Sequence, residues 1–285
     1  LMVLLWNSLA TRDVRLMQRS MSIDYGTPKD GVWINYARCH DDIGWGFEKD
    51  IIRDLGMDPE AHKQFIIQFM EGKFPGSFAK GELYEFNPET LDARNSGTMA
   101  SLCGLEEAIL KKDRYKLELA VKRILLLNSV IISYTGIPLL YSGDEIGTLN
   151  WWDYKKDETI AHDSRWLHRA PMDWEKAGNR HDMGTVEGIL FSSIREMIRV
   201  RKENPIFASN ISSIPIDTGN KAVFAFHRED KMLVLANFSE ERQVVNCNAV
   251  NWFGLPWELH DLIQGKTVPL WDNIVLGPYE YLWLA

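Results

Sequence analysis

Three consecutive polar residues, His40, Asp41 and Asp42, follow an apolar segment and come just before Gly44. Carboxylates and an imidazole can move protons, form hydrogen bonds with a ligand, or stabilise a developing positive charge. In α/β enzymes such residues commonly stand where a parallel strand ends, because the loops after the strands build the pocket. We therefore interpret this triplet as part of a pocket.

Two other chemistries fit the same segment. Cys39 beside His40 could act as a thiol nucleophile, although neighbouring residues on a strand point to opposite faces, which favours a buried structural cysteine. Adjacent His and Asp could also bind a metal, as in HD-type phosphohydrolases. Those motifs lie on helices with further histidine ligands, and no suitably spaced His partners accompany His40 and Asp41, so we expect no metal site.

The triplet has to be positioned by an expected strand at 32–38, which a turn-rich connection at 25–31 precedes. A second strand is expected at 137–141. Between them, apolar residues at helical spacing predict a helix at about 115–133 that packs on the sheet. A strand, a helical return and a second strand make the βαβ unit of a parallel sheet.

The remaining pattern divides the chain near residue 206. Helices are expected at 1–19, 59–70, 98–111 and 186–203, with long loops at 75–95 and 147–185. After the boundary, short strand candidates recur at hairpin-like intervals, which indicates a small antiparallel β domain over 206–285. These candidates are 223–227, 232–238, 243–246, 259–261 and 279–284.

Composition excludes several classes of protein. The 285 residues carry a formal net charge of −8 and no long run of Lys or Arg, so a nucleic-acid partner is not expected. The apolar start at 1–6 is too short to span a membrane and lacks the features of a signal peptide. Three widely spaced cysteines favour a reducing, cytoplasmic location. No nucleotide, haem or flavin motif is present, and we expect no cofactor.

Two features of the sequence indicate that the chain is part of a larger protein. The chain opens with Leu1 in the middle of a helical pattern, and two strands cannot make a stable parallel sheet with both faces covered. We therefore expect a C-terminal fragment.

Three ordered motifs, Asn35–Trp45, Gly136–Asn150 and Asp163–Trp166, resemble the α-amylase superfamily, glycoside hydrolase family 13, and within it the amylosucrases and sucrose hydrolases. The resemblance implies the C-terminal part of a (β/α)8 TIM barrel over 1–205, with the last two strand–helix units. An antiparallel β-sandwich would follow. The long insertion at about 46–112 would shape the acceptor side.

The resemblance also implies roles for individual residues, with a small carbohydrate such as sucrose, or an α-glucan acceptor, as ligand. Asp41 would be the transition-state stabiliser, and His40 would hydrogen-bond the same donor-sugar hydroxyls. Asp42 and Arg94 would contact the leaving sugar. Arg165 would pair with an upstream Asp and close the pocket, which would favour sucrose over the middle of a starch chain.

Family members use an Asp nucleophile and a Glu acid/base, and the resemblance places both upstream of Leu1. We therefore expect the whole protein to work by a retaining double displacement and the isolated chain to be inactive. Asp41 with Glu145 could form a two-carboxylate site, but the resemblance argues against that pairing. A catalytically silent, amylase-like binding subunit remains the alternative.

One residue departs from the amylosucrase pattern. Lys63 stands where that pattern has Arg, and Lys cannot make a bidentate contact. We expect weaker binding of a growing glucan and a shift towards sucrose hydrolysis. Trp45, Trp151 and Trp152 could stack on sugar rings, although packing in the core is the default for Trp.

Overall fold

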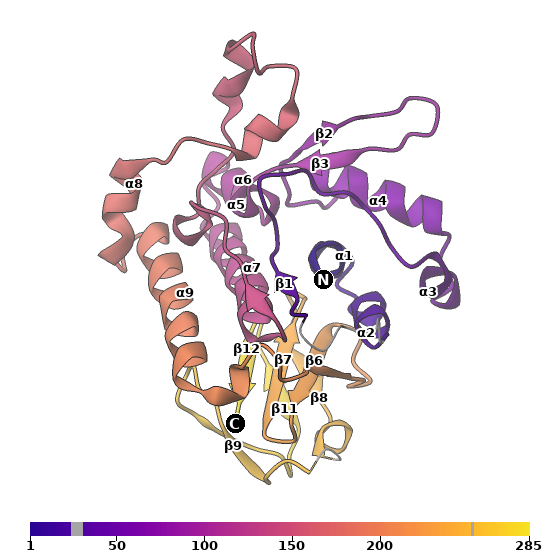
Figure 1. Ribbon diagram of the computed structural model, residues 1–285, viewed down its shortest axis with the longest axis vertical. Coiled ribbons are helices and arrows are strands. Elements are labelled where there is room, and N and C mark those ends of the chain that lie inside the picture. Colours follow the sequence, from indigo (N-terminus) through magenta and orange to yellow (C-terminus); the bar gives the residue numbers. More distant parts are fainter. Residues whose placement is uncertain (24–30, 252–253) are drawn as a thin grey trace.

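The computed structural model of the chain describes residues 1–23, 31–251 and 254–285. In Figure 1 the long helix α7 (Arg114–Ser133) lies at the centre, with helices and loops above it and the β-rich C-terminal part below it. The turn-rich connection predicted at 25–31 lies, except for Gly31, outside the described residues.

Two parallel strands, β1 (Ile34–Asn35) and β4 (Ile137–Pro138), pair with each other, and α7 lies between them in the chain. The predicted βαβ unit is therefore present. Both strands are shorter than predicted, and neither has a second neighbour among the described residues. Trp33 and Ile34 consequently remain 53% and 57% exposed.

Helix α7 is the element on which the two parts of the chain pack. Asp113 caps its first turn by accepting the N–H of Lys116 at 3.0 Å. Near its other end, the Ser129 hydroxyl accepts the indole N–H of Trp283 at 2.9 Å, which fixes the C-terminal strand against the helix. The predicted helix α9 (Val186–Glu203) is confirmed and packs along α7.

The single helix predicted at 1–19 is wrong in one respect: the structure has two, α1 (Met2–Thr11) and α2 (Arg15–Met21). Arg12 ends α1 in the left-handed conformation, with φ 55°. The side chain of Asp13 then accepts the N–H of the first residue of α2 at 3.0 Å, which starts the second helix.

The helix predicted at 98–111 is also divided, into α5 (Met99–Leu102) and α6 (Leu105–Leu110). Between them Gly104 has φ +93°, and a β-carbon there would lie 3.0 Å from the carbonyl oxygen of Phe78. A glycine is required at this position, and it breaks the helix.

The insertion at 46–112 is more ordered than a loop. The loop predicted at 75–95 contains most of a β-hairpin, while the helix predicted at 59–70 is confirmed. The elements before α5 are α3 (Lys49–Asp54), α4 (Pro59–Glu71), β2 (Glu82–Tyr84) and β3 (Arg94–Ser96).

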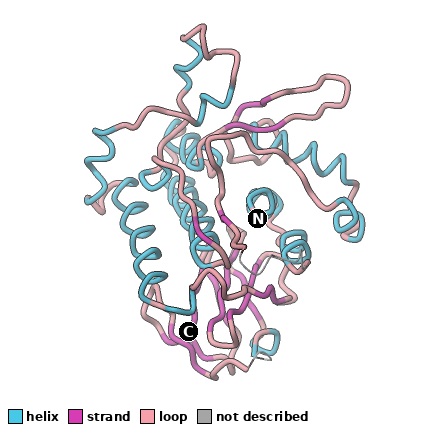
Figure 2. Tube along the Cα trace, viewed as in Figure 1, coloured by secondary structure: helices cyan, strands magenta, loops and turns pink. Residues whose placement is uncertain are grey.

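The segment predicted as a loop at 147–185 is mostly irregular, as Figure 2 shows. It contains short helical turns at Trp152–Lys156 and Ser164–His168, and the short helix α8 (Trp174–Gly178). The turn at Ser164–His168 packs against β2 and β3, so it brings Arg165 to the hairpin.

The C-terminal part contains all five predicted strands and three that the sequence analysis missed. An antiparallel sheet has the order β12 (Tyr281–Leu284), β7 (Met232–Asn237), β6 (Val223–Arg228), β5 (Ile214–Ile216). Two smaller antiparallel pairs accompany it: β8 (Gln243–Val245) with β11 (Ile274–Leu276), and β9 (Glu258–His260) with β10 (Thr267–Pro269).

Alternate residues of this sheet pack in two different cores. Phe224, Phe226 and Val234 belong to the cluster that contains the buried face of α7. Leu233 and Leu235 belong to a second cluster with residues of the two smaller pairs. This alternation is the period of two expected for a strand with both faces covered. The boundary near residue 206 stays a prediction.

Candidate functional site

The loop that carries the triplet is joined to the hairpin. The backbone of Ile43 exchanges two hydrogen bonds with that of Asn95, at 2.8 and 3.1 Å. The indole N–H of Trp45 donates to the side-chain oxygen of Asn95 at 2.7 Å, and Trp45 is only 5% exposed. Trp45 is therefore a core residue, and its alternative role as a platform for a sugar ring is wrong.

A buried ion pair holds the base of the loop. The guanidinium of Arg38 lies 2.8 Å from the carboxylate of Asp144, with both side chains 2% exposed. Burial raises the pKa of Asp144, and the positive charge of Arg38 counteracts this rise. Arg38 also lies over the ring of Tyr141, 4.3 Å from its centroid. The pair therefore links the end of β1 to the turn after β4.

The carbonyl oxygen of His40 is held by two side chains: His168, the last residue of the turn at Ser164–His168, and Arg169, which follows it. The ring of His168 contacts this oxygen through Nε2 at 3.2 Å, and Arg169 donates to it through Nε at 2.7 Å. On its other side, Nδ1 of His168 accepts the N–H of Gly97 at 3.1 Å. The side chain of His40 itself is exposed and available to a ligand.

Asp41 and Arg165, which the sequence predicts at one site, are in contact. Nη1 of Arg165 lies 3.1 Å from Oδ1 of Asp41, and the same guanidinium pairs with Asp163 at 2.8 Å. Arg165 also lies over the ring of Tyr84, 4.7 Å from its centroid. The hydrogen bond from Arg165 holds the pKa of Asp41 below its ordinary value. Asp41 thus stays ionised while half exposed.

Asp42 and Arg94, both predicted to contact the leaving sugar, lie farther apart than Asp41 and Arg165. Nη1 of Arg94 is 3.5 Å from Asp42 and 3.4 Å from Glu85. The side chain of Asp42 is 5% exposed, and its Oδ1 has no hydrogen-bond partner among the described residues. Burial raises the pKa of Asp42, and Arg94 opposes that rise.

The other residues singled out in the sequence have local partners. Lys63 pairs with Asp92 at 2.7 Å, which ties α4 to the connection between β2 and β3. The indole N–H of Trp152 donates to Glu106 at 2.7 Å. Glu145 accepts the N–H of Gly143 in its own turn at 2.7 Å. Trp151 is half-buried.

Sequence reasoning missed most of the residues that support the triplet. Arg38 and Asp144 could have been found, since a charged residue inside an apolar strand and another just after the next strand suggest a buried pair. His168 and Arg169 contact a backbone oxygen, which leaves no pattern in the sequence.

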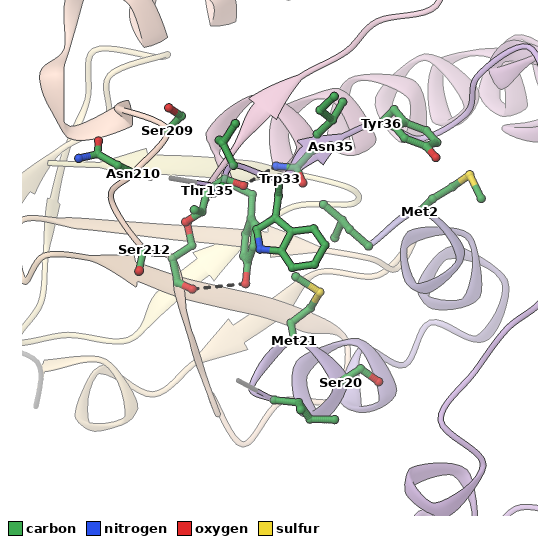
Figure 3. Close-up of a pocket in the computed structure, with 17 residues that line it drawn as sticks. Met2, Ser20, Met21, Trp33, Asn35, Tyr36, Thr135, Ser209, Asn210 and Ser212 are labelled. Atoms are coloured by element: carbon green, nitrogen blue, oxygen red, sulfur yellow. Dashed lines mark hydrogen bonds between the residues drawn. The ribbon is translucent and has the colours of Figure 1, made fainter. Parts of the chain in front are cut away.

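A cavity of about 640 Å³ lies elsewhere, beside β1. Figure 3 shows Trp33 beside Met21, with Ser209 and Ser212 across from them. None of the five predicted site residues lines this cavity.

Three further observations bear on the sequence predictions. In the part of the chain that the structure describes, no group of three or more His, Cys, Asp or Glu residues could hold a metal ion. Over the same residues, no helix is both long and apolar enough to cross a membrane. Cys39, Cys103 and Cys247 are all free.

Comparison with known proteins finds curated relatives with partial coverage, among them the following two. Alpha-amylase 2 of Dictyoglomus thermophilum is 24% identical over 158 residues, 55% of this chain and 24% of that protein. Glucosylglycerate phosphorylase of Escherichia coli is 22% identical over 164 residues, 57% of this chain and 28% of that protein. The matches thus span about a quarter of the length of these relatives. No protein-family model matches the chain.

Among solved structures, AmyP in complex with maltotriose has a TM-score of 0.47 and 20% identity, with 58% of this chain and 35% of that chain covered. MutB in complex with isomaltulose has a TM-score of 0.43 and 21% identity, with 57% and 38% covered. Together with the three sequence motifs, the curated relatives support the similarity of this chain to the C-terminal part of proteins of the α-amylase family, glycoside hydrolase family 13.

Proposed function

We propose that the chain is the sugar-holding part of a retaining glycoside hydrolase or glucosyltransferase of the amylosucrase or sucrose hydrolase type. It acts on sucrose or α-glucosides, within a (β/α)8 barrel followed by a β-sandwich. Exposed apolar side chains at Ile34 of β1 and at Trp33 just before it support further strands beside that strand. We also propose a cytoplasmic location, supported by the three free cysteines.

One observation carries the proposal: of the two adjacent carboxylates, Asp41 is accessible and Asp42 is buried. Arg165 keeps Asp41 oriented and accessible, while Asp42 has a buried oxygen that has no partner among the described residues. The exposed carboxylate of Asp41 is therefore the one that can accept hydrogen bonds from the hydroxyl groups of a ligand. Sugars supply such hydroxyl groups at the spacing of neighbouring carbons.

The geometry suggests how these groups take part in cleavage of a glycosidic bond. Asp41 accepts hydrogen bonds from the hydroxyl groups of the donor sugar, and these strengthen as positive charge develops on the ring. His40 reaches the same hydroxyl groups from the exposed side. Asp42 and Arg94 contact the leaving sugar, and Arg165 bounds the pocket. The nucleophile and the acid, which must lie about 5–5.5 Å apart, are not assigned to this chain.

The first test is binding of sucrose to the ¹⁵N-labelled chain, followed by NMR. We expect sucrose to shift the amide resonances of residues 40–43, and Asp41→Asn to weaken this binding at least about tenfold, the size of one lost charged hydrogen bond. Asp50→Asn, on the exposed face of α3, is the matched control and leaves the shifts unchanged. Shifts confined to other parts of the chain contradict the proposal.

The second test is turnover. The chain by itself is expected to release no glucose from sucrose, whereas a protein that joins it to the two missing carboxylates is expected to do so. Robust release of glucose from sucrose by the 285-residue chain would contradict the proposal that the nucleophile and the acid/base lie outside this chain. Binding without turnover in the larger protein identifies a silent binding subunit.

A further inference from the structure

The hydrogen bonds of His168 fix the position of its proton. Its Nδ1 faces the backbone N–H of Gly97 at 3.1 Å, and an N–H can only donate. Nδ1 is therefore the unprotonated acceptor of the neutral ring, and Nε2 carries the hydrogen. Nε2 in turn lies 3.2 Å from the carbonyl oxygen of His40, which can only accept. Both ring nitrogens are thus satisfied in one tautomer, in a side chain that is 2% exposed.

This ring joins segments that are far apart in the sequence. Gly97 directly follows β3, His40 directly precedes Asp41, and His168 ends the turn that carries Arg165. The carbonyl of His168 also accepts Nη1 of Arg38 at 3.1 Å, which connects the ring to the buried ion pair. The imidazole therefore contacts the hairpin, the triplet loop and the turn at once, in addition to the Ile43–Asn95 backbone bonds and the contact of Arg169 with His40.

We propose that His168, as the neutral Nε2–H tautomer, is a positioning residue for Asp41. By fixing the peptide group between His40 and Asp41 against Gly97, it sets where the carboxylate of Asp41 stands relative to Arg165. Whether the position of Asp41 matters for catalysis rests on the proposed function. The link from Gly97 through His168 to the carbonyl of His40, here called the coupling, does not.

Protonation of the ring would break the coupling, because Nδ1–H would then face the N–H of Gly97. Burial and the positive charge of Arg38 lower the pKa of His168 to about 4, and Arg169 acts in the same direction. The carbonyl of His40 and the carboxylate of Asp41 oppose this decrease. The described surroundings therefore keep the ring neutral, and the coupling intact, down to mildly acidic pH.

Two substitutions separate the two hydrogen bonds. In His168→Asn the amide oxygen can replace Nδ1 as the acceptor for Gly97, while in His168→Gln the amide nitrogen can replace Nε2 as the donor to His40. The first readout is a long-range ¹H–¹⁵N correlation spectrum of the imidazole, which identifies the tautomer directly. The others are exchange of the Gly97 amide and the ¹⁵N shift of the Asp41 amide, which shares a peptide group with the His40 carbonyl.

We expect the Nε2–H tautomer in the native chain. His168→Gln should speed exchange at Gly97 about tenfold, the size of one lost buried hydrogen bond, and leave the Asp41 amide in place. His168→Asn should do the reverse. An Nδ1–H tautomer, or an Asp41 amide that moves in neither variant, overturns the proposal.

If either variant fails to fold, an acid titration with His168 unchanged still decides the question. On acidification in the Asp41→Asn background, where that carboxylate no longer titrates, the ring of His168 and the amides of Gly97 and residue 41 should titrate together near pH 4. If the His168 ring and the two amides titrate with different pH midpoints, the coupling is overturned. Sucrose-induced shifts at residues 40–43 are a separate arm: their absence, with the coupling present, means that only the proposed function has failed.

Discussion

Arg165 holds Asp41 with a guanidinium that Asp163 has already fixed. Asp163 accepts both the backbone N–H and Nε of Arg165, at 3.0 and 2.9 Å, within the same turn. Nη1 of Arg165 then reaches Oδ1 of Asp41 at 3.1 Å, across 124 positions of sequence. The orientation of the exposed carboxylate is therefore set by a local contact in a distant turn.

Arg165→Lys should raise the pKa of Asp41 towards the ordinary value of an aspartate. Lysine keeps the positive charge but lacks the planar guanidinium that lets Arg165 contact Asp163 and Asp41 together. The hydrogen bond to Asp41, which lowers the pKa of that carboxyl, is therefore lost. Titration of the Asp41 carboxyl carbon by ¹³C NMR measures this shift. Arg53→Lys, on α3, is the control; an equal change in both variants would contradict the assignment.

Asp42→Asn should remove sugar binding without loss of stability. At pH 7 the native chain buries one carboxylate oxygen of Asp42 that has no partner among residues 1–23, 31–251 and 254–285. The neutral amide should therefore raise the free energy of unfolding by up to about 1 kcal/mol, or leave it unchanged. Asp144→Asn is the matched comparison, since it leaves Arg38 buried without its counter-ion and should cost about 3–5 kcal/mol. Urea denaturation of both variants tests the contrast, and a large loss in Asp42→Asn would refute it.

His168 should make the chain less stable in mild acid. Its pKa is about 4 in the folded state and about 6.5 when unfolded, so the unfolded chain binds the proton first as the pH falls. The contribution of His168 is complete above pH 6.5 and is lost on going down to pH 4, by about 3 kcal/mol.

Urea denaturation from pH 7 to pH 4 measures this loss, and His168→Gln should flatten the dependence by that amount. Acidic residues also titrate in this range, so the comparison is the difference between the two curves. Parallel curves for the native chain and the variant would rule out the contribution of His168.

The parts of the fold that follow apolar periodicity could be predicted, and the parts set by single contacts could not. The βαβ unit follows from two apolar runs and the apolar face of α7. The division between α5 and α6 depends on the carbonyl of Phe78, which requires a glycine at 104. The hairpin was missed because Glu82–Tyr84 and Arg94–Ser96 have no alternation of apolar and polar residues.

The candidate site divides in the same way. Asp41, Asp42, Arg94 and Arg165 were singled out as site residues by motifs that resemble a family. The contacts of Asp41 with Arg165 and of Asp42 with Arg94 were not predicted, and only the structure shows them. His168 could not be predicted, because its partners are the backbone groups of His40 and Gly97. A backbone oxygen is the same at every position, so only the fold selects it.

Lys63→Arg should lengthen the products if the larger protein turns over sucrose as proposed. Lys63 is occupied by Asp92, and an arginine could keep that ion pair while offering further N–H groups to a glucan. The native protein with sucrose alone should give mainly glucose and fructose, and the variant a larger share of linear glucan, as seen by chromatography. Long linear glucan from the native protein would refute this prediction.

Arg228 joins the two parts of the chain through backbone contacts. Its side chain is fully buried, and burial lowers the pKa of its guanidinium to about 10. It donates four hydrogen bonds of 2.8–3.0 Å, to the carbonyls of Ser133, Ile206 and Ala208 and the hydroxyl of Ser213. The end of α7 and the segment after α9 are therefore both held by one residue of β6.

Arg228→Met should accordingly lower the free energy of unfolding by about 3 kcal/mol or more, because it leaves several buried carbonyls without a donor. Arg228→Lys keeps the charge but can satisfy fewer of them, so it should cost less than the methionine variant and still more than a surface substitution. Arg199→Met on α9 is the control, since an exposed arginine with two glutamate partners should contribute only about 0.5 kcal/mol. Urea denaturation at pH 7 gives all three values. If Arg228→Met were no worse than the control, the hydrogen bonds of Arg228 would not contribute to holding the two parts of the chain together.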